Sequence, residues 1–466
     1  MRASILFLSV AHAWPDAQHN LPRAEHGQQD FSQALQLQLQ TSHLAAKDLQ
    51  YTRANGQPYP NPTSAERIGE TGPILLKHHH LIENLAHFVR ERIPERVVHA
   101  AGAGAHGVFT TTTDFAKQHT MMDVFSEVGK QTPITVRFST VGGEAGSADQ
   151  ARDPRGFAMK FRTQKGIWDI VMNNTPVFFL RDPAKFPFFV HTQKRNPQTH
   201  RKDPNAVWDY FGQNAESLHQ FLRLFSDAGT PQGFVNMDGF TSHSYRWIKK
   251  DSSWVYVKLH AVSDQGIHNF TAAESEKIAG ENPDYAAEDL FTRIESGKFP
   301  SWTVYAQVLT PAEAEKFRYN VLDLTKDWPE NLVAKHEIGK FELNQNPQNY
   351  FAEIEQAAFS PSNVVDGWEI SEDPVLQARA FSYPDAQRYR LGTNFQQIPV
   401  NCPMNPVGKD GVFGGVTGNQ GSRPNYLSSF QSINIPPRQY DDSNHTIWTA
   451  GAIRYLSQVS SQLLIR

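Results

Sequence analysis

Residues 132–139 alternate strictly between apolar and polar side chains. In Thr132-Pro-Ile-Thr-Val-Arg-Phe-Ser139, the apolar residues at 134, 136 and 138 alternate with a threonine, Arg137 and Ser139. Successive side chains of a β-strand point to opposite faces, so this pattern predicts a strand with one apolar face and one polar face. If the polar face is also buried, its arginine and hydroxyl groups need polar partners.

Further strands are expected in the same part of the chain. Strand-like stretches occur at 156–163, 168–173, 254–262 and 302–309. This many strands in one region, joined by helical connections, predict an α+β fold with an antiparallel barrel or sandwich. We place the strand domain at residues 71–343.

The N-terminal region differs from the strand domain in composition. Residues 1–70 are rich in Gln, His, Asn and Pro and have little apolar periodicity, which predicts an extended arm. Within this arm, residues 1–13 have the shape of a short secretory signal peptide with a small-residue cleavage site. From Leu75 to Arg92 the apolar residues recur at helical spacing, and Pro94 is expected to end that helix.

The region after the strand domain is predicted to be largely irregular. Residues 344–440 contain many Pro, Asn and Gly residues and little periodicity, apart from one expected helix. In that helix Arg379, Tyr383, Gln387 and Arg390 are spaced at i, i+4, i+8 and i+11, which places them on one face. Residues 441–466 are then a short C-terminal remnant.

Composition excludes several classes of function. The formal net charge of −4 gives no basic excess for nucleic acid or for an anionic membrane surface. No apolar run approaches the roughly 20 residues that span a bilayer. The single cysteine, Cys402, excludes an internal disulfide framework and a zinc site built from several thiolates. We therefore expect neither a nucleic-acid partner nor a membrane partner.

A second informative stretch runs from residue 91 to residue 107. It places His99 between a charged helix end and a run of alanines and glycines. Such small residues leave room for a large, flat molecule beside the imidazole. We interpret this stretch and the helix face that carries Tyr383 as the two walls of one cofactor site.

Several long motifs make the chain resemble the haem-containing monofunctional catalases from about residue 72 to residue 426. These are Arg152-Asp-Pro-Arg-Gly-Phe-Ala158, Asn173-Asn-Thr-Pro-Val-Phe-Phe-Leu-Arg-Asp-Pro183, Gln193-Lys-Arg-Asn-Pro-Gln-Thr-His200 and Asn346-Pro-Gln-Asn-Tyr-Phe-Ala-Glu353. The resemblance implies an eight-stranded antiparallel β-barrel with an N-terminal arm and a long wrapping segment. It also implies disproportionation of hydrogen peroxide to water and dioxygen. The chain is similar to the small-subunit type, with the C-terminal helical domain missing or vestigial.

The resemblance assigns roles to the two walls. It implies Tyr383 as the iron ligand, and Arg379 one helical turn earlier as the positive charge that favours its phenolate over the phenol, whose pKa is roughly 10. It implies His99 as the base that moves a proton between the peroxide oxygens. Asn173 would donate to the departing oxygen, and Ser139 would hold the other imidazole nitrogen.

The resemblance also implies how the rest of the haem is held. Arginine stays charged and binds carboxylates with two donors, and three arginines match the positions that bind the two haem carboxylates: Arg96, Arg137 and Arg390. The expected apolar lining consists of Val98, Phe178 and Phe186, with Phe179 and Phe189 beside them. Asp153 matches the acidic residue of the family's access channel.

NADPH is expected to bind weakly or not at all. His219, Ser226 and Trp328 match the nicotinamide-cofactor pocket of small-subunit catalases. At other matching positions the usual arginine, asparagine, lysine and histidine are replaced by Ala228, Asp238, Val262 and Glu330. The two carboxylates would repel a phosphate-bearing ligand and leave its charges unpaired.

Two alternative functions stay open at this point. One is a catalase-like haem oxidoreductase that acts on an organic substrate, and the other is a non-catalytic haem-binding protein. The expected partners are hydrogen peroxide or another small peroxide and further copies of the chain, forming a tetramer as the family does, or a dimer. The chain ends in Ile465-Arg466 without a Ser-Lys-Leu signal, so a peroxisomal or cytoplasmic location stays open, as does secretion through residues 1–13.

Overall fold

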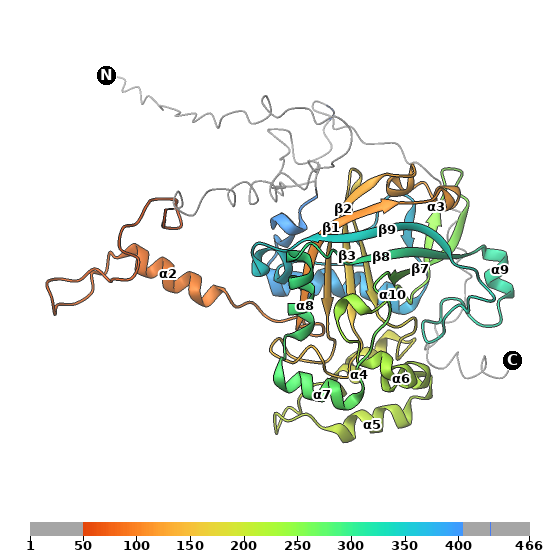
Figure 1. Cartoon of the computed structure of the whole chain (residues 1–466), viewed down its shortest axis with the longest axis horizontal. Coiled ribbons are helices and arrows are strands. Elements are labelled where there is room, and N and C mark those ends of the chain that lie inside the picture. Colours follow the sequence, from red (N-terminus) through yellow and green to blue (C-terminus); the bar gives the residue numbers. More distant parts are fainter. Residues whose placement is uncertain (1–49, 404–428, 430–466) are drawn as a thin grey trace.

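A computed structural model describes residues 50–403 and residue 429 (Figure 1). The predicted signal peptide, most of the N-terminal arm and the C-terminal remnant lie outside the described residues. Among the helices that are described, none is long and apolar enough to cross a membrane.

The described strands form an antiparallel barrel. Neighbouring strands follow the order β7-β5-β4-β3-β2-β1-β9-β8, and the pairing of β8 with β7 closes the ring of eight. The barrel strands are β1 Gly102–Thr111, β2 Gln131–Ser139, β3 Gly156–Thr163, β4 Gly166–Asn173, β5 Gly239–Phe240, β7 Trp254–Ser263, β8 Ser301–Leu309 and β9 His336–Gln345. The short strands β6 Tyr245–Ile248 and β10 Trp368–Ile370 extend the sheet from β7. The structure therefore confirms the predicted eight-stranded barrel.

The two faces of β2 have the environments that the alternation predicts. Ile134, Val136 and Phe138 belong to the main apolar core, together with Trp168 and Trp302 of other strands. The polar face of β2 is also buried, and its side chains find polar partners outside the barrel interior. One of these partners, described below, is the histidine singled out from the sequence.

Helices cover the barrel and extend from it. The α-helices within the described residues are α2 His79–Arg90, α3 Phe115–His119, α4 Phe186–Gln193, α5 Pro204–Gln213, α6 Leu218–Phe225, α7 Ala272–Glu281, α8 Tyr285–Glu295, α9 Pro311–Lys316 and α10 Pro374–Leu391. A π-helical turn, η7, spans Phe351–Glu355. Short 3₁₀ turns lie at Asp123–Phe125, Pro183–Lys185, Ala215–Ser217, Asp227–Gly229, Phe234–Asn236, Phe395–Gln397 and Pro399–Asn401.

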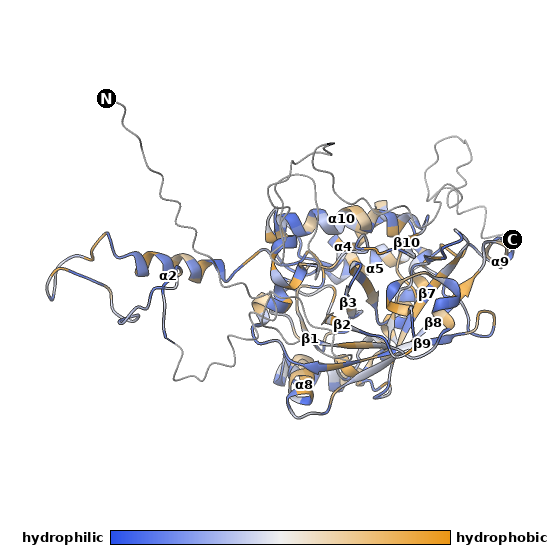
Figure 2. Ribbon diagram, turned by 90° about the horizontal axis from the view of Figure 1, so that it is seen from above, coloured by the Kyte–Doolittle hydropathy of each residue, from blue (hydrophilic) through white to orange (hydrophobic). Residues whose placement is uncertain are grey.

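Helix α2 projects away from the barrel in both views (Figures 1 and 2). Its apolar residues Ile82, Leu85 and Phe88 are all more than half exposed. The sequence predicted a helix from Leu75, but the helix begins at His79, because the preceding residues form a turn.

The segment after β9 wraps around the outside of the barrel. It contains η7, β10 and α10, whereas the sequence predicted only the helix. Its residues Ala357, Phe359 and Val400 form a small core with Val171 of β4. The carboxylate of Asp169, on the same strand, accepts hydrogen bonds from the backbone of Ser360 and the side chain of Asn363. These contacts hold the wrapping segment to the barrel, and Tyr383 of α10 packs against the same small core.

Candidate active site

A cavity of about 530 Å³ lies between the barrel, α4 and α10. It is lined by every site residue that the sequence predicts: Arg96, Val98, His99, Arg137, Ser139, Asn173, Phe178, Phe186, Arg379, Tyr383 and Arg390. The structure thus brings the two predicted walls to one cavity, although they lie some 280 residues apart in the chain. Asp153, Phe179 and Phe189 line it as well.

His99 has a backbone conformation that few residues with side chains adopt. Its φ is 66°, in the left-handed region, which is costly for a residue with a Cβ atom. Three hydrogen bonds hold it there: its N–H donates to the carbonyl of Val141 at 3.1 Å, and Arg137 donates to the carbonyls of His99 at 2.9 Å and Ala100 at 3.0 Å. Arg137 therefore fixes the backbone that carries the imidazole.

The imidazole of His99 is oriented by Ser139. The His99 Nδ1 atom lies 2.9 Å from Ser139 Oγ, within hydrogen-bond distance. Burial, followed by the positive charges of Arg137, Arg379 and Arg96, lowers the pKa of His99 to about 3. The imidazole is therefore neutral near pH 7 and able to accept a proton.

Gly156 makes room for this histidine, a role that the sequence motifs do not reveal. It is paired with Ser139 across strands β2 and β3. A Cβ atom at this position would lie 2.4 Å from His99 Nδ1 and 2.4 Å from Ser139 Oγ, far inside contact distance. Gly156 occurs within one of the motifs, but only its cross-strand neighbours show why the position needs a glycine.

The opposite wall is formed by α10. The helix begins after Asp373, whose carboxylate caps the N–H groups of Val375 and Leu376. Nη2 of Arg379 donates to the phenol oxygen of Tyr383 at 2.8 Å. Burial lowers the pKa of Arg379, but Tyr383, Tyr245 and Asp373 together outweigh it, so that the pKa is raised above its ordinary value. A fixed positive charge therefore lies directly against the phenol.

A second histidine on this side was not predicted. His243 lines the cavity, and its Nδ1 atom lies 2.6 Å from the carboxylate of Asp373. Both side chains are almost completely buried. They are 130 positions apart in the sequence, so spacing gives no signal that would select His243 among the chain's nineteen histidines.

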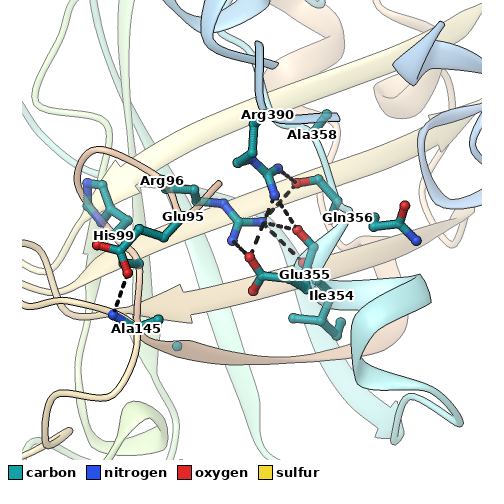
Figure 3. A network of polar contacts seen from close by, with 12 residues as sticks. Glu95, Arg96, His99, Ala145, Ile354, Glu355, Gln356, Ala358 and Arg390 are labelled. Carbon is teal, nitrogen blue, oxygen red and sulfur yellow. Dashed lines mark hydrogen bonds and ion pairs between the residues drawn. The ribbon is translucent and has the colours of Figure 1, made fainter. Parts of the chain in front are cut away.

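The three predicted carboxylate-binding arginines all line the cavity, and the charges of Arg137 and Arg390 act on Arg96; Arg96 and Arg390 are seen in Figure 3. Arg96 donates to the carboxylate of Glu355 at 3.1 Å and to three backbone carbonyls at and just after the end of η7. Arg390 donates to the carbonyls of Glu355 and Ala357 and to the side chain of Gln387. Glu355 was not predicted, since its partners are distant in sequence.

Phenylalanine rings narrow one side of the cavity. Phe179 and Phe189 stack at 4.4 Å between ring centroids, and Phe178 and Phe186 pack against the same apolar cluster. Asp153 lines the same cavity and accepts hydrogen bonds from the backbone of Val141 and Gly142, each at 2.6 Å. Burial raises the pKa of its carboxyl group.

The carboxylates at the predicted nicotinamide positions have local partners. Asp238 accepts a hydrogen bond from the backbone N–H of Ser263 at 2.9 Å, and burial raises its pKa. Glu330 forms an ion pair with Lys335 at 3.4 Å. Both contacts weaken the repulsion on which the NADPH prediction depends, and weak or absent binding stays a prediction.

Known proteins resemble the chain over most of its length. A catalase of Schizosaccharomyces pombe is 54% identical over 417 residues, which cover 88% of this chain and 80% of that protein. A peroxisomal catalase of Candida albicans is 54% identical over 408 residues, covering 86% of this chain and 83% of that protein.

Solved structures agree with these relatives. The crystal structure of a fungal catalase matches with a TM-score of 0.85 and 50% identity, covering 88% of this chain and 83% of that chain. Catalase A from Saccharomyces cerevisiae matches with a TM-score of 0.84 and 49% identity, covering 88% of this chain and 85% of that chain. The family model described as Catalase matches residues 52–432. This chain therefore belongs to the catalase family.

Proposed function

We propose that the cavity between His99 and Tyr383 binds haem and is where this catalase disproportionates hydrogen peroxide. The observation that carries the proposal is the arrangement of the cavity lining. A neutral imidazole held by Ser139 and a phenol hydrogen-bonded to Arg379 line the same cavity, and so do three arginines whose charges act on one another.

The residues of the cavity suit a large, flat dicarboxylate cofactor. The volume of about 530 Å³ falls within the range of sites that enclose a whole cofactor. Arg137 lines the cavity, and its buried Nε atom has no hydrogen-bond partner among the described residues, so a donor is available to a carboxylate. The phenol of Tyr383 offers the type of oxygen donor that binds ferric haem iron.

Each wall then has a defined task. Bound haem supplies an iron centre that is oxidised by one peroxide molecule and reduced by the next. Tyr383 would hold the iron, and the guanidinium of Arg379 would stabilise negative charge on the phenol oxygen. Arg96, Arg137 and Arg390 would bind the haem carboxylates.

On the opposite wall, His99 would take a proton from one peroxide oxygen and return it to the other. Its lowered pKa of about 3 keeps the imidazole unprotonated and ready for the first step. Ser139 fixes the ring orientation, and the amide of Asn173, which lines the same cavity, would donate to the departing oxygen. The phenylalanines would admit a small peroxide and delay larger reductants.

Purification with an absorption spectrum and an oxygen-evolution assay tests the proposal. We expect haem-loaded protein that evolves oxygen from hydrogen peroxide. Tyr383→Phe should weaken or empty the haem site, because phenylalanine offers iron no donor atom. Tyr51→Phe is the control, since Tyr51 is 49% exposed and does not line the cavity.

Two results would contradict the proposal. One is wild-type protein that stays haem-free when produced in haem-supplemented cells, or that binds haem without evolving oxygen. The other is Tyr383→Phe protein with unchanged haem content and an unchanged spectrum.

We also infer that the protein is a homo-oligomer. The exposed apolar side chains of α2 need a neighbouring subunit to bury them. A monomer in light scattering at micromolar concentration would contradict this.

A peroxisomal location is supported by relatives named peroxisomal catalases and is tested by microscopy of a fluorescently tagged protein.

A further inference from the structure

Glu355 occupies an unusual position beside the arginines of the cavity. Its carboxylate lies 3.1 Å from Arg96 and 3.7 Å from Arg390, and its side chain is only 20% exposed. Both arginines line the cavity, whereas Glu355 does not. The carboxylate therefore contacts the guanidinium groups without lining the cavity: it accepts a hydrogen bond from Arg96 and forms an ion pair with Arg390 (Figure 3).

The three arginines affect one another as like charges. Burial and then the charges of Arg137 and Arg390 lower the pKa of Arg96 well below its ordinary value. Burial also lowers the pKa of Arg390 to about 10, and Glu355 acts in the opposite direction on both groups. The carboxylate thus offsets part of the repulsion within the cluster.

The net charge of this cluster matches a doubly charged ligand. Three guanidinium groups and one carboxylate leave the cluster with two positive charges. A cofactor with two ionised carboxylates would neutralise them. If the Glu355 carboxylate were removed, the three arginines would keep one uncompensated positive charge after a doubly charged ligand had bound. This charge would lie in a site that is largely withdrawn from water.

We propose that Glu355 is a specificity-determining residue: its carboxylate lowers the net charge of the arginine cluster and so limits how strongly the site prefers an ionised dicarboxylate cofactor to an uncharged one. The inference rests on the proposed haem site. If Glu355 has this role, its charge affects how much more tightly the site binds a ligand with ionised carboxylates than a neutral ester of nearly the same shape. A merely structural role for Glu355 would change the binding of both forms equally.

The test compares haemin with haemin dimethyl ester. Full-length protein produced without haem is titrated with each compound, and binding is followed by the Soret absorbance. Glu355→Gln should increase the preference for the free dicarboxylate over the diester by about fivefold, because the cluster becomes more positive and only the ionised form responds. The Fe(III)/Fe(II) potential of the reconstituted variant should shift upward, since a negative charge near the haem has been lost.

Two variants serve as controls. Glu355→Asp keeps the charge and should keep the wild-type preference. Glu83→Gln removes a carboxylate from an ion pair of similar length, 3.0 Å, which joins Arg53 to α2, and should leave the preference unchanged.

An unchanged or reduced preference in Glu355→Gln would overturn the proposal, and so would the same change in Glu83→Gln. If Glu355→Gln cannot be produced folded, Glu355→Asp still decides, because a changed preference with the charge retained contradicts the inference. Wild-type protein that binds neither compound would instead refute the proposed haem site itself.

Discussion

At the scale of single residues, the imidazole of His99 is the group on which the proposed chemistry depends. It is neutral, held by Ser139 and carried on a strained backbone that Arg137 fixes. Strain of this kind persists only where the surrounding structure imposes it. These contacts place one nitrogen toward its hydroxyl partner and leave the other for a substrate in the cavity.

We expect His99→Ala to lose turnover while retaining haem. Loss of a general acid–base group reduces rates by about 10²–10⁴, whereas the iron ligand lies on the other wall. Oxygen evolution and the Soret absorbance measure the two properties separately. His268→Ala, at an exposed position, is the control. Loss of haem from His99→Ala would show that the two walls have been assigned the wrong way round.

We expect Gly156→Ala to impair the same step without touching a reacting group. The added Cβ would lie 2.4 Å from both His99 Nδ1 and Ser139 Oγ, so one of them must move. The cost should be about 1–3 kcal/mol in the free energy of unfolding, with a clear loss of kcat.

Gly146→Ala provides the matched control, because a Cβ at Gly146 meets nothing within 4 Å. Denaturant unfolding and oxygen evolution are measured for both variants. Equal, near-wild-type behaviour of Gly156→Ala and Gly146→Ala would contradict the packing argument.

At the scale of elements, local pattern predicts some strands and misses others. β2 alternates and is composed of residues that favour strands, and its predicted extent differs from the observed one by a single residue. β1 is built from Gly-Ala-Gly-Ala-His-Gly and has no such pattern. It is a strand because β2 and β9 hydrogen-bond to its two edges, which local sequence cannot show.

Local sequence also cannot show contacts between residues that are far apart in the chain, and this explains which site residues the sequence predicts. Tyr383, Arg379 and Arg390 share a helix, so their spacing alone is enough to group them on one face. Glu355 and Arg96 are 259 positions apart in the sequence. Their side chains come into contact only because the fold places η7 next to Arg96. The resemblance to a known family was enough to predict the residues that line the cavity. Residues that contact those lining residues from outside the cavity, such as Glu355, could be identified only from the three-dimensional structure.

The wrapping segment is hydrogen-bonded to one member of an ion pair that is buried between β3 and β4 of the barrel. Lys160 Nζ lies 2.8 Å from Asp169 Oδ1, and the two side chains are 1% and 0% exposed. Asp169 also accepts a hydrogen bond from the backbone N–H of Ser360 in the wrapping segment. Removing the lysine would leave a buried carboxylate without its counter-charge.

Lys160→Met should therefore lower the free energy of unfolding by about 3–5 kcal/mol. Lys277→Met, which removes a lysine that is 70% exposed from an i,i+4 pair, should change it by less than about 0.5 kcal/mol. Denaturant titration of both variants measures the difference. Similar small effects for the two variants would mean that the buried Lys160–Asp169 pair contributes little to stability.

At the scale of the whole molecule, buried neutral histidines make stability depend on pH. Burial, followed by the charge of Lys335, lowers the pKa of His260 to about 3, from an ordinary value of 6.5. Its Nε2 atom lies 2.7 Å from Gln307 Oε1, and Gln307 in turn donates to the carbonyl of Trp328. His260 thus helps to tie the loop after β8 to the barrel.

The direction of the pH effect follows from proton binding. Below pH 6.5 the unfolded chain takes up a proton at His260 that the folded chain does not bind until about pH 3, so stability falls as the pH falls through this range. His99 acts in the same direction, with a pKa of about 3. Asp149 opposes them, because burial raises its pKa from 3.8 to about 6, and the folded chain binds its proton first.

We therefore expect His260→Asn to flatten the pH dependence of stability. Asparagine retains a polar side chain but does not titrate, so the loss of unfolding free energy between pH 6.5 and pH 4 should shrink by an amount on the order of 1–3 kcal/mol relative to wild type. Denaturant midpoints at pH 7, 5.5 and 4 measure it, with His268→Asn at an exposed position as the control. Parallel pH profiles for wild type and His260→Asn would mean that the pKa of His260 is the same in the folded and the unfolded chain. His260 would then not contribute to the loss of stability in acid.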